Sequence, residues 1–172
     1  SIDLCSQHYQ LNKQDFVIGR EFDSQGAVIS VSTTQNNASQ CLLMIGSVFQ
    51  LLSDVLYKRY REDKRFVLQT RCSVASAVEA MQLDALQASE RLTHHLIAKE
   101  MALYLNNEQL KHVGDCYQLV PMPNPTSVLT RHAFMINGMN ESCAELAQQI
   151  RTEILKGKSQ PSTEPDLKDQ AS

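Results

Sequence analysis

Apolar residues between Ser76 and Leu105 recur at helical spacing and form two separate stripes. The first stripe is Val78, Met81, Ala85, Ala88, Leu92, Leu96 and Leu103. The second stripe lies on a different side of the same helix and consists of Leu83, Leu86, Ile97, Met101 and Leu105. The pattern predicts one long helix over about 73–105. A helix with two apolar stripes must bury the second against the rest of its domain or against another protein.

Alternating apolar and polar residues predict an N-terminal β-hairpin. Residues 15–23 and 27–33 alternate with period two on either side of a short loop that ends in Gly26. Glycine tolerates the positive φ that tight hairpin turns require. We therefore expect two antiparallel strands with Gly26 at the turn.

A helix is also predicted over 39–61, because many of its apolar residues fall within about a third of the helical circumference. This face contains Cys41, Ile45, Val48, Phe49, Leu52, Val55 and Leu56. The outer face contains Leu43, Ser47, Gln50, Asp54 and Arg61 and is expected to be mostly solvated. The segment is the best candidate for a core helix.

The rest of the chain predicts a strand, a second hairpin and a final helix. Residues 65–72 alternate and are assigned as a strand, although a continuing helix would also accept them. The apolar runs 116–120 and 127–136 flank a loop with three alternating prolines, which interrupt hydrogen-bond ladders. Asn140 is expected to cap a helix over 140–156.

These elements predict the α+β class, in which antiparallel hairpins form one sheet that packs against three helices, the central one long. Residues 1–157 are expected to form a single domain. Residues 158–172 contain two prolines and a single leucine, and this composition predicts a polar, disordered tail.

Charge and composition argue against some functions. The chain has 172 residues, a formal net charge of −3 and a pI near 5.9, which is a poor match for nucleic acid. No window approaches the roughly 18 consecutive apolar residues of a membrane-spanning helix, so we expect no span. The five cysteines include no C-x-x-C pair and resemble small buried apolar residues in a reducing compartment. This favours a cytoplasmic location.

Three residue groups could carry chemistry, and each has a simpler structural explanation. Cys116 follows His112 by four residues, but no nucleophile motif surrounds it. Glu90 and His94 could supply half of a metal site, which needs three or four ligands. The basic run 58–65 contains two acids and fits the cation-rich end of a helix. We therefore predict a protein that is not an enzyme and that holds no metal or cofactor.

The second stripe of the long helix is the remaining candidate site. Its residues Leu83, Leu86, Ile97, Met101 and Leu105 are predicted to bind a helix or extended segment of another protein, or a second copy of this chain. The predicted element order over 15–156 resembles that of bacterial secretion chaperones, which are small acidic α+β proteins that hold partner segments. The resemblance implies a non-enzymatic interaction subunit, an adaptor or chaperone-like component of a multiprotein complex.

Two alternatives stay open. A small-molecule-sensing regulatory domain would need a ligand-sized cavity between the sheet and the long helix, and a densely packed interior would exclude it. An enzyme would use Cys116 or the Glu90–His94 pair.

Overall fold

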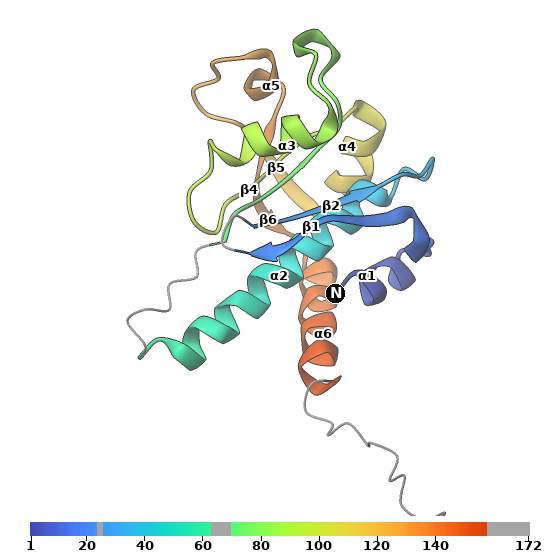
Figure 1. Ribbon diagram of the computed structural model, residues 1–172, viewed down its shortest axis with the longest axis vertical. Coiled ribbons are helices and arrows are strands. Elements are labelled where there is room, and N and C mark those ends of the chain that lie inside the picture. The colour runs from blue at the N-terminus through green and yellow to red at the C-terminus, as the bar shows by residue number, and fades with distance from the viewer. Residues whose placement is uncertain (24–25, 63–69, 158–172) are drawn as a thin grey trace, which may run out of the picture.

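The computed structural model describes residues 1–23, 26–62 and 70–157 and has the α+β class that the sequence predicts (Figure 1). Its helices are α1 (Ile2–His8), α2 (Ala38–Tyr60), α3 (Ala85–Thr93), α4 (Asn107–Gly114), α5 (Val128–Arg131) and α6 (Glu141–Gly157). Its strands are β1 (Phe16–Asp23), β2 (Gly26–Val31), β3 (Cys72–Ala75), β4 (Met101–Tyr104), β5 (Tyr117–Pro121) and β6 (Phe134–Met139). The strands form two sheets, so the prediction of a single sheet is wrong.

The larger sheet has the strand order β3–β4–β6–β5. β3 and β4 are parallel, with Val74 opposite Leu103, whereas β4 pairs with β6 and β6 with β5 in antiparallel fashion. A parallel pair needs a crossover connection, and α3 with its flanking turns supplies it. Successive strand residues point to opposite faces, so the two faces of this sheet support two separate cores.

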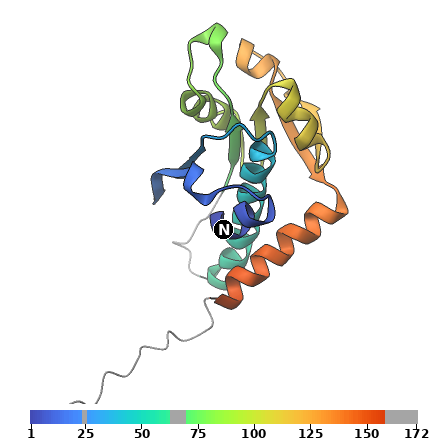
Figure 2. The ribbon, with the colours of Figure 1, turned by 90° about the vertical axis from the view of Figure 1, so that its right-hand side faces the viewer.

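One face of the larger sheet, here called the α2 face, packs against α1, α2, α4 and α6 (Figure 2). Its largest fully buried side chains are Leu43, Met44, Val48, Leu103 and Val113. The opposite face, the α3 face, packs against α3 and α5. Its core is Val78, Leu83, Ala88, Leu92, Leu96, Ala102, Met122, Leu129 and Ala133.

The N-terminal hairpin is confirmed. β1 and β2 are antiparallel, with Phe16 opposite Val31, and Gly26 has a φ of +104°. Phe16, Ile29 and Val31 pack against the α2-face core, which attaches the hairpin to the rest of the molecule.

The predicted long helix over 73–105 is wrong. This segment forms β3, a short 3-10 helix at Glu79–Met81, α3 and β4 instead. The capping box that starts a helix is at Asp84 and Gln87, not at Ser76, and Lys99 turns the chain into β4 with a φ of +68°. The first three residues of β4 are all buried, so the strand lacks the alternation of apolar and polar residues that identifies a half-buried strand. Its apolar pattern therefore also fits a helix.

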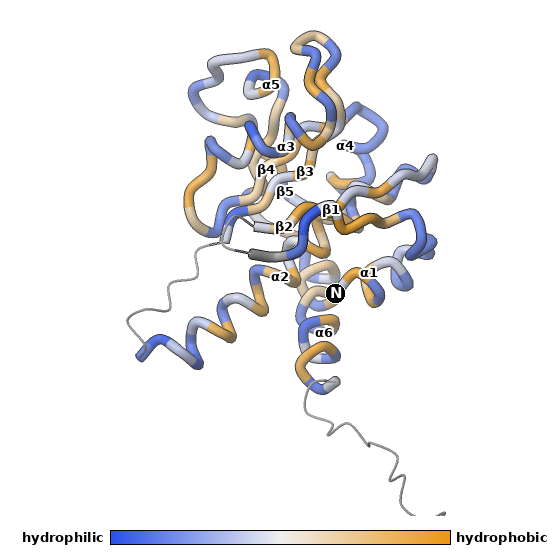
Figure 3. The backbone as a smooth tube through the Cα atoms, in the orientation of Figure 1, coloured by the Kyte–Doolittle hydropathy of each residue, from blue (hydrophilic) through white to orange (hydrophobic). Residues whose placement is uncertain are grey.

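The predicted helix over 39–61 is confirmed as α2, but its predicted outer face is partly wrong. Leu43 and Ser47 are buried, because α1, α4, α6 and the larger sheet surround the first half of α2. Hydrophilic residues dominate only the outer end of the helix (Figure 3).

Among the described helices, α2 alone is long and apolar enough to cross a membrane, with a mean hydropathy of 1.4 over its most apolar window. Half of that window is buried inside the fold. The core helix of a globular protein meets the same criterion, so this is only a weak sign of a span.

The C-terminal half agrees with the predicted order in part. α6 and the antiparallel pairing of the two apolar runs are confirmed. Residues 128–131, predicted as strand, form α5, and β6 continues to Met139. α4 was not predicted; Asn106 caps it with a capping box to Gln109. Of the predicted strand over 65–72, residues 65–69 lie outside the described residues, as does the predicted tail over 158–172.

Candidate functional site

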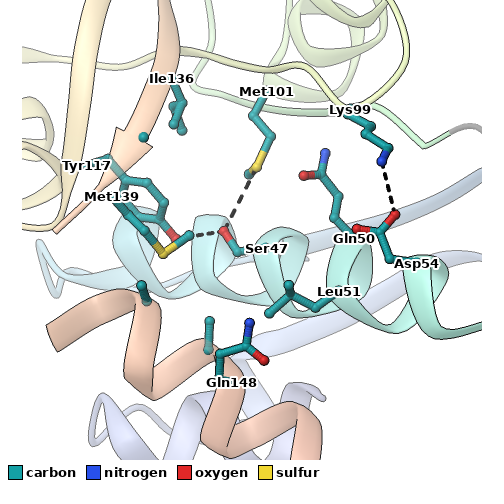
Figure 4. Close-up of a pocket in the computed structure, with 13 residues that line it drawn as sticks. Ser47, Gln50, Leu51, Asp54, Lys99, Met101, Tyr117, Ile136, Met139 and Gln148 are labelled. Atoms are coloured by element: carbon teal, nitrogen blue, oxygen red, sulfur yellow. Dashed lines mark hydrogen bonds and ion pairs between the residues drawn. The ribbon is translucent and has the colours of Figure 1, made fainter. Parts of the chain in front are cut away.

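A pocket of about 320 Å³ lies on the α2 face, where α2, α6 and the larger sheet meet (Figure 4). Ligand pockets are usually about 300–1,000 Å³, so this one suits a small molecule. The lining residues are Ser47, Gln50, Leu51, Asp54, Lys99, Met101, Tyr117, Ile136, Gly138, Met139, Ala144, Ala147 and Gln148.

One row of side chains on α2 forms a wall of the pocket. Ser47, Gln50, Leu51 and Asp54 have the spacing i, i+3, i+4, i+7, which places them on one face of a helix. Three of the four are polar, although the rest of this part of α2 is largely apolar. The sequence predicted Ser47, Gln50 and Asp54 as part of a mostly solvated face. Polar residues at helical spacing on an otherwise apolar core helix were the sequence signal that could have revealed the pocket.

Gly46 brings α2 close to the larger sheet beside the pocket. A Cβ atom at Gly46 would lie 2.6 Å from Cys72 Sγ and 3.3 Å from Met101 Cε. A side chain here would have to displace the Cys72 and Met101 side chains or move α2 away from β3 and β4. The glycine therefore keeps the polar row of α2 next to the start of β4.

A buried pair of hydroxyl groups stands at one end of the pocket. Ser47 Oγ donates to the Leu43 carbonyl oxygen at 2.8 Å and lies 2.9 Å from the Tyr117 hydroxyl. Because a serine hydroxyl carries one proton, Tyr117 is the donor to Ser47. Burial raises the pKa of Tyr117 and outweighs the lowering by the Ser47 hydrogen bond, so the phenol stays neutral.

Gln50 leaves a polar atom without a partner inside the protein. Its side chain rises from α2 into the pocket beside Met101 (Figure 4). The Nε2 atom has almost no accessible surface and no hydrogen-bond partner among the described residues. A buried donor without a partner costs about 1–3 kcal/mol of folding free energy. Because this nitrogen is closed off from the space inside the pocket, the cost belongs to the packing of the fold.

The charged side chains of the lining pair with each other. Lys99 Nζ lies 3.3 Å from Asp54 Oδ1, and both side chains are substantially exposed to solvent. The rest of the lining is neutral and includes the thioethers of Met101 and Met139. The interior thus offers apolar surface, hydroxyl oxygen and amide N–H groups.

The α6 side of the pocket is fixed to the start of β5. A disulfide joins Cys116 to Cys143, which are 27 residues apart. Asn140 caps α6 by accepting from the Cys143 N–H at 2.9 Å, as predicted, and its own N–H donates to the Cys116 carbonyl oxygen at 2.8 Å. These connections hold α6 over the pocket, next to Tyr117.

The disulfide corrects the prediction that all five cysteines are unpaired. It also removes Cys116 as a candidate nucleophile, because a disulfide sulfur carries no free thiolate. Cys5 and Cys41 are free and fully buried, as small apolar residues would be. Burial raises the pKa of Cys5 to about 11 and that of Cys41 to about 12, so both stay protonated thiols.

The structure does not bring the five predicted partner-binding residues together. Leu83 is buried in the α3-face core, whereas Met101 and Leu105 are buried in the α2-face core. Leu86 and Ile97 are 44% and 71% exposed. The prediction that these five residues form one docking face is therefore wrong, because the long helix that would have carried them does not form.

No group of three or more His, Cys, Asp or Glu side chains that could hold a metal ion occurs among the described residues. Glu90 and His94 lie at the end of α3, where both are exposed. Of the basic run 58–65, residues 63–65 lie outside the described part of the chain.

A second hollow, of about 350 Å³, lies between β4, α4 and α5. Its polar lining includes Arg131 and His132, which are both exposed. Leu105 is the one buried residue of its described lining, whereas Ser47, Met101, Tyr117 and Ala147 of the first lining are all buried. The pocket beside α2 reaches further into the fold and is therefore the stronger candidate.

No protein-family model matches this sequence, and no curated protein matches it at a significant level. The function must therefore be inferred from the geometry of the pocket and the surface.

Proposed function

We propose that the protein is a small-molecule-sensing regulatory domain whose ligand binds in the pocket between α2, α6 and the larger sheet. The pocket of about 320 Å³, with apolar walls and a row of polar side chains from α2, carries this proposal. The alternative proposed from the sequence placed such a pocket between the sheet and the long helix over 73–105. The proposed site lies against α2 instead.

Binding without catalysis fits the groups in the pocket. Ser47 donates its proton to a backbone carbonyl, and Tyr117 is a neutral phenol, so neither acts as a general base toward the other. Asp54 is paired with Lys99 near solvent. We therefore propose a non-enzymatic role in which the pocket holds a ligand unchanged.

Native mass spectrometry of the protein purified from its own cells tests this function. We expect a bound small molecule in addition to the mass of the chain. Ala144→Leu should abolish that species, because Ala144 lines the pocket and a larger side chain would fill it. Ala80→Leu is the matched control, since Ala80 is exposed and remote from the lining. A ligand lost equally from both variants, or never found, would contradict the proposal.

A second candidate is the interaction subunit, an adaptor or secretion-chaperone-like component, that the sequence favoured. The observation that favours it is the exposure of large aliphatic side chains: Val17, Ile18, Leu86 and Ile97 are 57%, 55%, 44% and 71% exposed. Exposed apolar side chains that form one contiguous patch mark protein contacts, and the proposal requires that these side chains contribute to such a patch. The partner would be another protein or a second copy of the chain.

Light scattering after gel filtration tests self-association, and pull-down tests a different partner. If Leu86 and Ile97 dock a protein, L86D and I97D should each remove the complex, while Q87E, a change beside Leu86 on the exposed surface, should keep it. If the protein is a monomer and neither L86D nor I97D removes a specific partner, the adaptor proposal is contradicted.

The compartment depends on the state of Cys116 and Cys143. Disulfides persist in oxidising compartments, whereas the cytoplasm predicted from the sequence keeps thiols reduced. Alkylation inside the native cells, followed by mass spectrometry, distinguishes the two. Labelled Cys116 and Cys143 support the cytoplasm, and protected cysteines support an oxidising compartment.

A further inference from the structure

The outer end of α2 carries basic and apolar side chains together, and none of them lines the pocket. Figure 1 shows this end of the helix extending away from the larger sheet. Residues 56–62 are all exposed, and we call them the α2 tip. We propose that the α2 tip is a docking surface for an anionic lipid membrane, on which it lies without crossing the bilayer.

Leu56, Tyr57 and Tyr60 form one apolar side of the α2 tip. Each of the three is between 40% and 49% exposed. Tyr60 follows Leu56 by four residues and Tyr57 by three, and residues at these spacings are neighbours on the surface of an α-helix. Large apolar residues that are scattered singly on a surface are ordinary, whereas these three adjoin one another. They therefore form a contiguous patch that is about half open to solvent.

Two arginines flank this apolar side. Successive residues of an α-helix are about 100° apart around its axis. This rotation places Arg59 at one edge of the apolar side and Arg61 at the other, while Lys58 lies on the opposite side of the helix. Arg61 keeps helical φ and ψ values, so the geometry holds for it as well. None of the three cations has an ion pair among the described residues.

The helix dipole explains the cations of the α2 tip but not its apolar side. Cations are favoured near the C-terminal end of a helix, because the last carbonyl groups carry partial negative charge. An exposed leucine and two exposed tyrosines gain nothing from that field. Tyrosine is enriched where a bilayer meets water, and arginine keeps its charge at that boundary while its aliphatic stem contacts apolar surface. An anionic bilayer accommodates both kinds of side chain at once.

The charge distribution of the chain supports the same orientation. Lys58, Arg59, Arg61 and Glu62 give the α2 tip a net charge of +2, whereas the whole chain carries −3. An anionic surface therefore attracts the tip and repels the rest of the molecule. Nucleic acid is anionic too, but its binding depends on neutralising many phosphates along a groove or stripe. A helix end with two net charges is too small for that purpose.

Co-sedimentation of the full chain with lipid vesicles tests the proposal. One set of vesicles contains phosphatidylcholine alone, and the other set also contains phosphatidylserine. We expect about 25-fold stronger partitioning onto the second set at physiological salt, because each of the two flanking arginines contributes about five-fold near an anionic surface. This preference should disappear at about 1 M salt, where the screening length is about 3 Å. Polyglutamate, a soluble polyanion without acyl chains, should not compete.

Substitutions on the α2 tip separate its parts. Arg59→Gln and Arg61→Gln should each lower partitioning onto the anionic vesicles about five-fold. Lys58→Gln should lower it less, because Lys58 lies on the far side of the helix. Tyr57→Ser should lower it several-fold by removing apolar contact. Arg91→Gln removes one exposed cation from α3 and is the matched control, which should change nothing. All five side chains are exposed, so these substitutions leave the fold intact.

Each contrary result overturns the docking surface for a different reason. Equal partitioning onto both sets of vesicles would show that the tip does not recognise an anionic surface. Equal effects of Arg91→Gln and Arg59→Gln would make the overall charge responsible. Competition by polyglutamate would assign the tip to an acidic protein, and binding that survives about 1 M salt would indicate insertion into the bilayer. The pocket takes no part in this binding, so none of these results bears on the proposed function.

Discussion

The two faces of the larger sheet are built differently. On the α3 face, Ala88, Ala102 and Ala133 are buried, and small side chains allow α3 and the strands to approach closely. The partly buried hydroxyl groups there have partners: Ser73 Oγ donates to the Ser89 carbonyl oxygen at 2.7 Å, and Thr93 Oγ1 donates to the same oxygen at 2.8 Å. On the α2 face, a pocket lies beside the contact of α2 with β3 and β4, and Gln50 Nε2 has no partner among the described residues.

This difference separates structural packing from candidate function. A face whose described buried side-chain polar atoms have partners loses nothing when no ligand is present, and it contributes stability alone. A face that keeps a hollow gives up packing contacts that a bound ligand can supply. The most informative substitutions are therefore matched pairs, with one member on each face.

The largest expected difference comes from truncating one leucine on each face. Leu92 is fully buried on the α3 face, and Leu92→Ala should lower the free energy of unfolding by about 4 kcal/mol. Leu51 is only partly buried beside the pocket, and Leu51→Ala should cost about 1–2 kcal/mol. Urea unfolding measures both, and equal losses would show that the α2 face is packed as densely as the α3 face.

Removal of the disulfide should act on the α2 face. The double variant Cys116→Ala, Cys143→Ala should lose about 3 kcal/mol of stability, because the bond closes a loop across 27 residues. Dithiothreitol should lower the stability of the unmodified protein by a similar amount and leave the double variant unchanged. A reductant effect that persists in the double variant would mean that another cysteine is responsible.

Adding volume should distinguish a filled interior from a hollow one. Ala88→Leu should cost about 2 kcal/mol, because the α3 face has no space for the added atoms. Ala144→Leu should cost less than about 1 kcal/mol, since its side chain can enter the pocket. Thermal melts of both variants, without added ligand, check the order. The reverse order would show that the pocket is closed in solution.

The smallest effect is expected for residues outside both cores. Ile97 is 71% exposed, and Ile97→Ala should change the stability of the isolated chain by less than about 0.5 kcal/mol. Met101, assigned by the sequence to the same stripe, is buried, and Met101→Ala should cost at least about 2 kcal/mol. A similar loss of stability from both variants would mean that Ile97 and Met101 are equally buried, which would contradict the structure.

Local sequence signals predicted α2, α6 and the N-terminal hairpin, because their causes lie within each segment. Asn140 supplies a side-chain cap to its own helix, and Gly26 supplies the positive φ of its own turn. The prediction of a helix over 73–105 is wrong for the opposite reason: the causes of the structure lie outside the segment. Met101 and Leu103 are apolar because they belong to a strand between two cores. Their spacing from earlier apolar residues matches a helical repeat only by coincidence.

The candidate site was even less accessible to sequence reasoning. Ser47, Gln50 and Asp54 were recognised as one face of α2, but whether that face meets water or a pocket depends on where α6 and β4 lie. The pairing of Cys116 with Cys143 likewise had no local signal.

The sequence by itself determined the α+β class and the elements whose hydrogen bonds close within a few residues, because caps, turns and alternation act over that distance. Only the tertiary structure decided that 72–75 and 101–104 pair as parallel strands and that a polar row of α2 borders a hollow. Both outcomes depend on contacts between segments far apart in the chain, and burial, unlike helical spacing, is a property of the assembled fold.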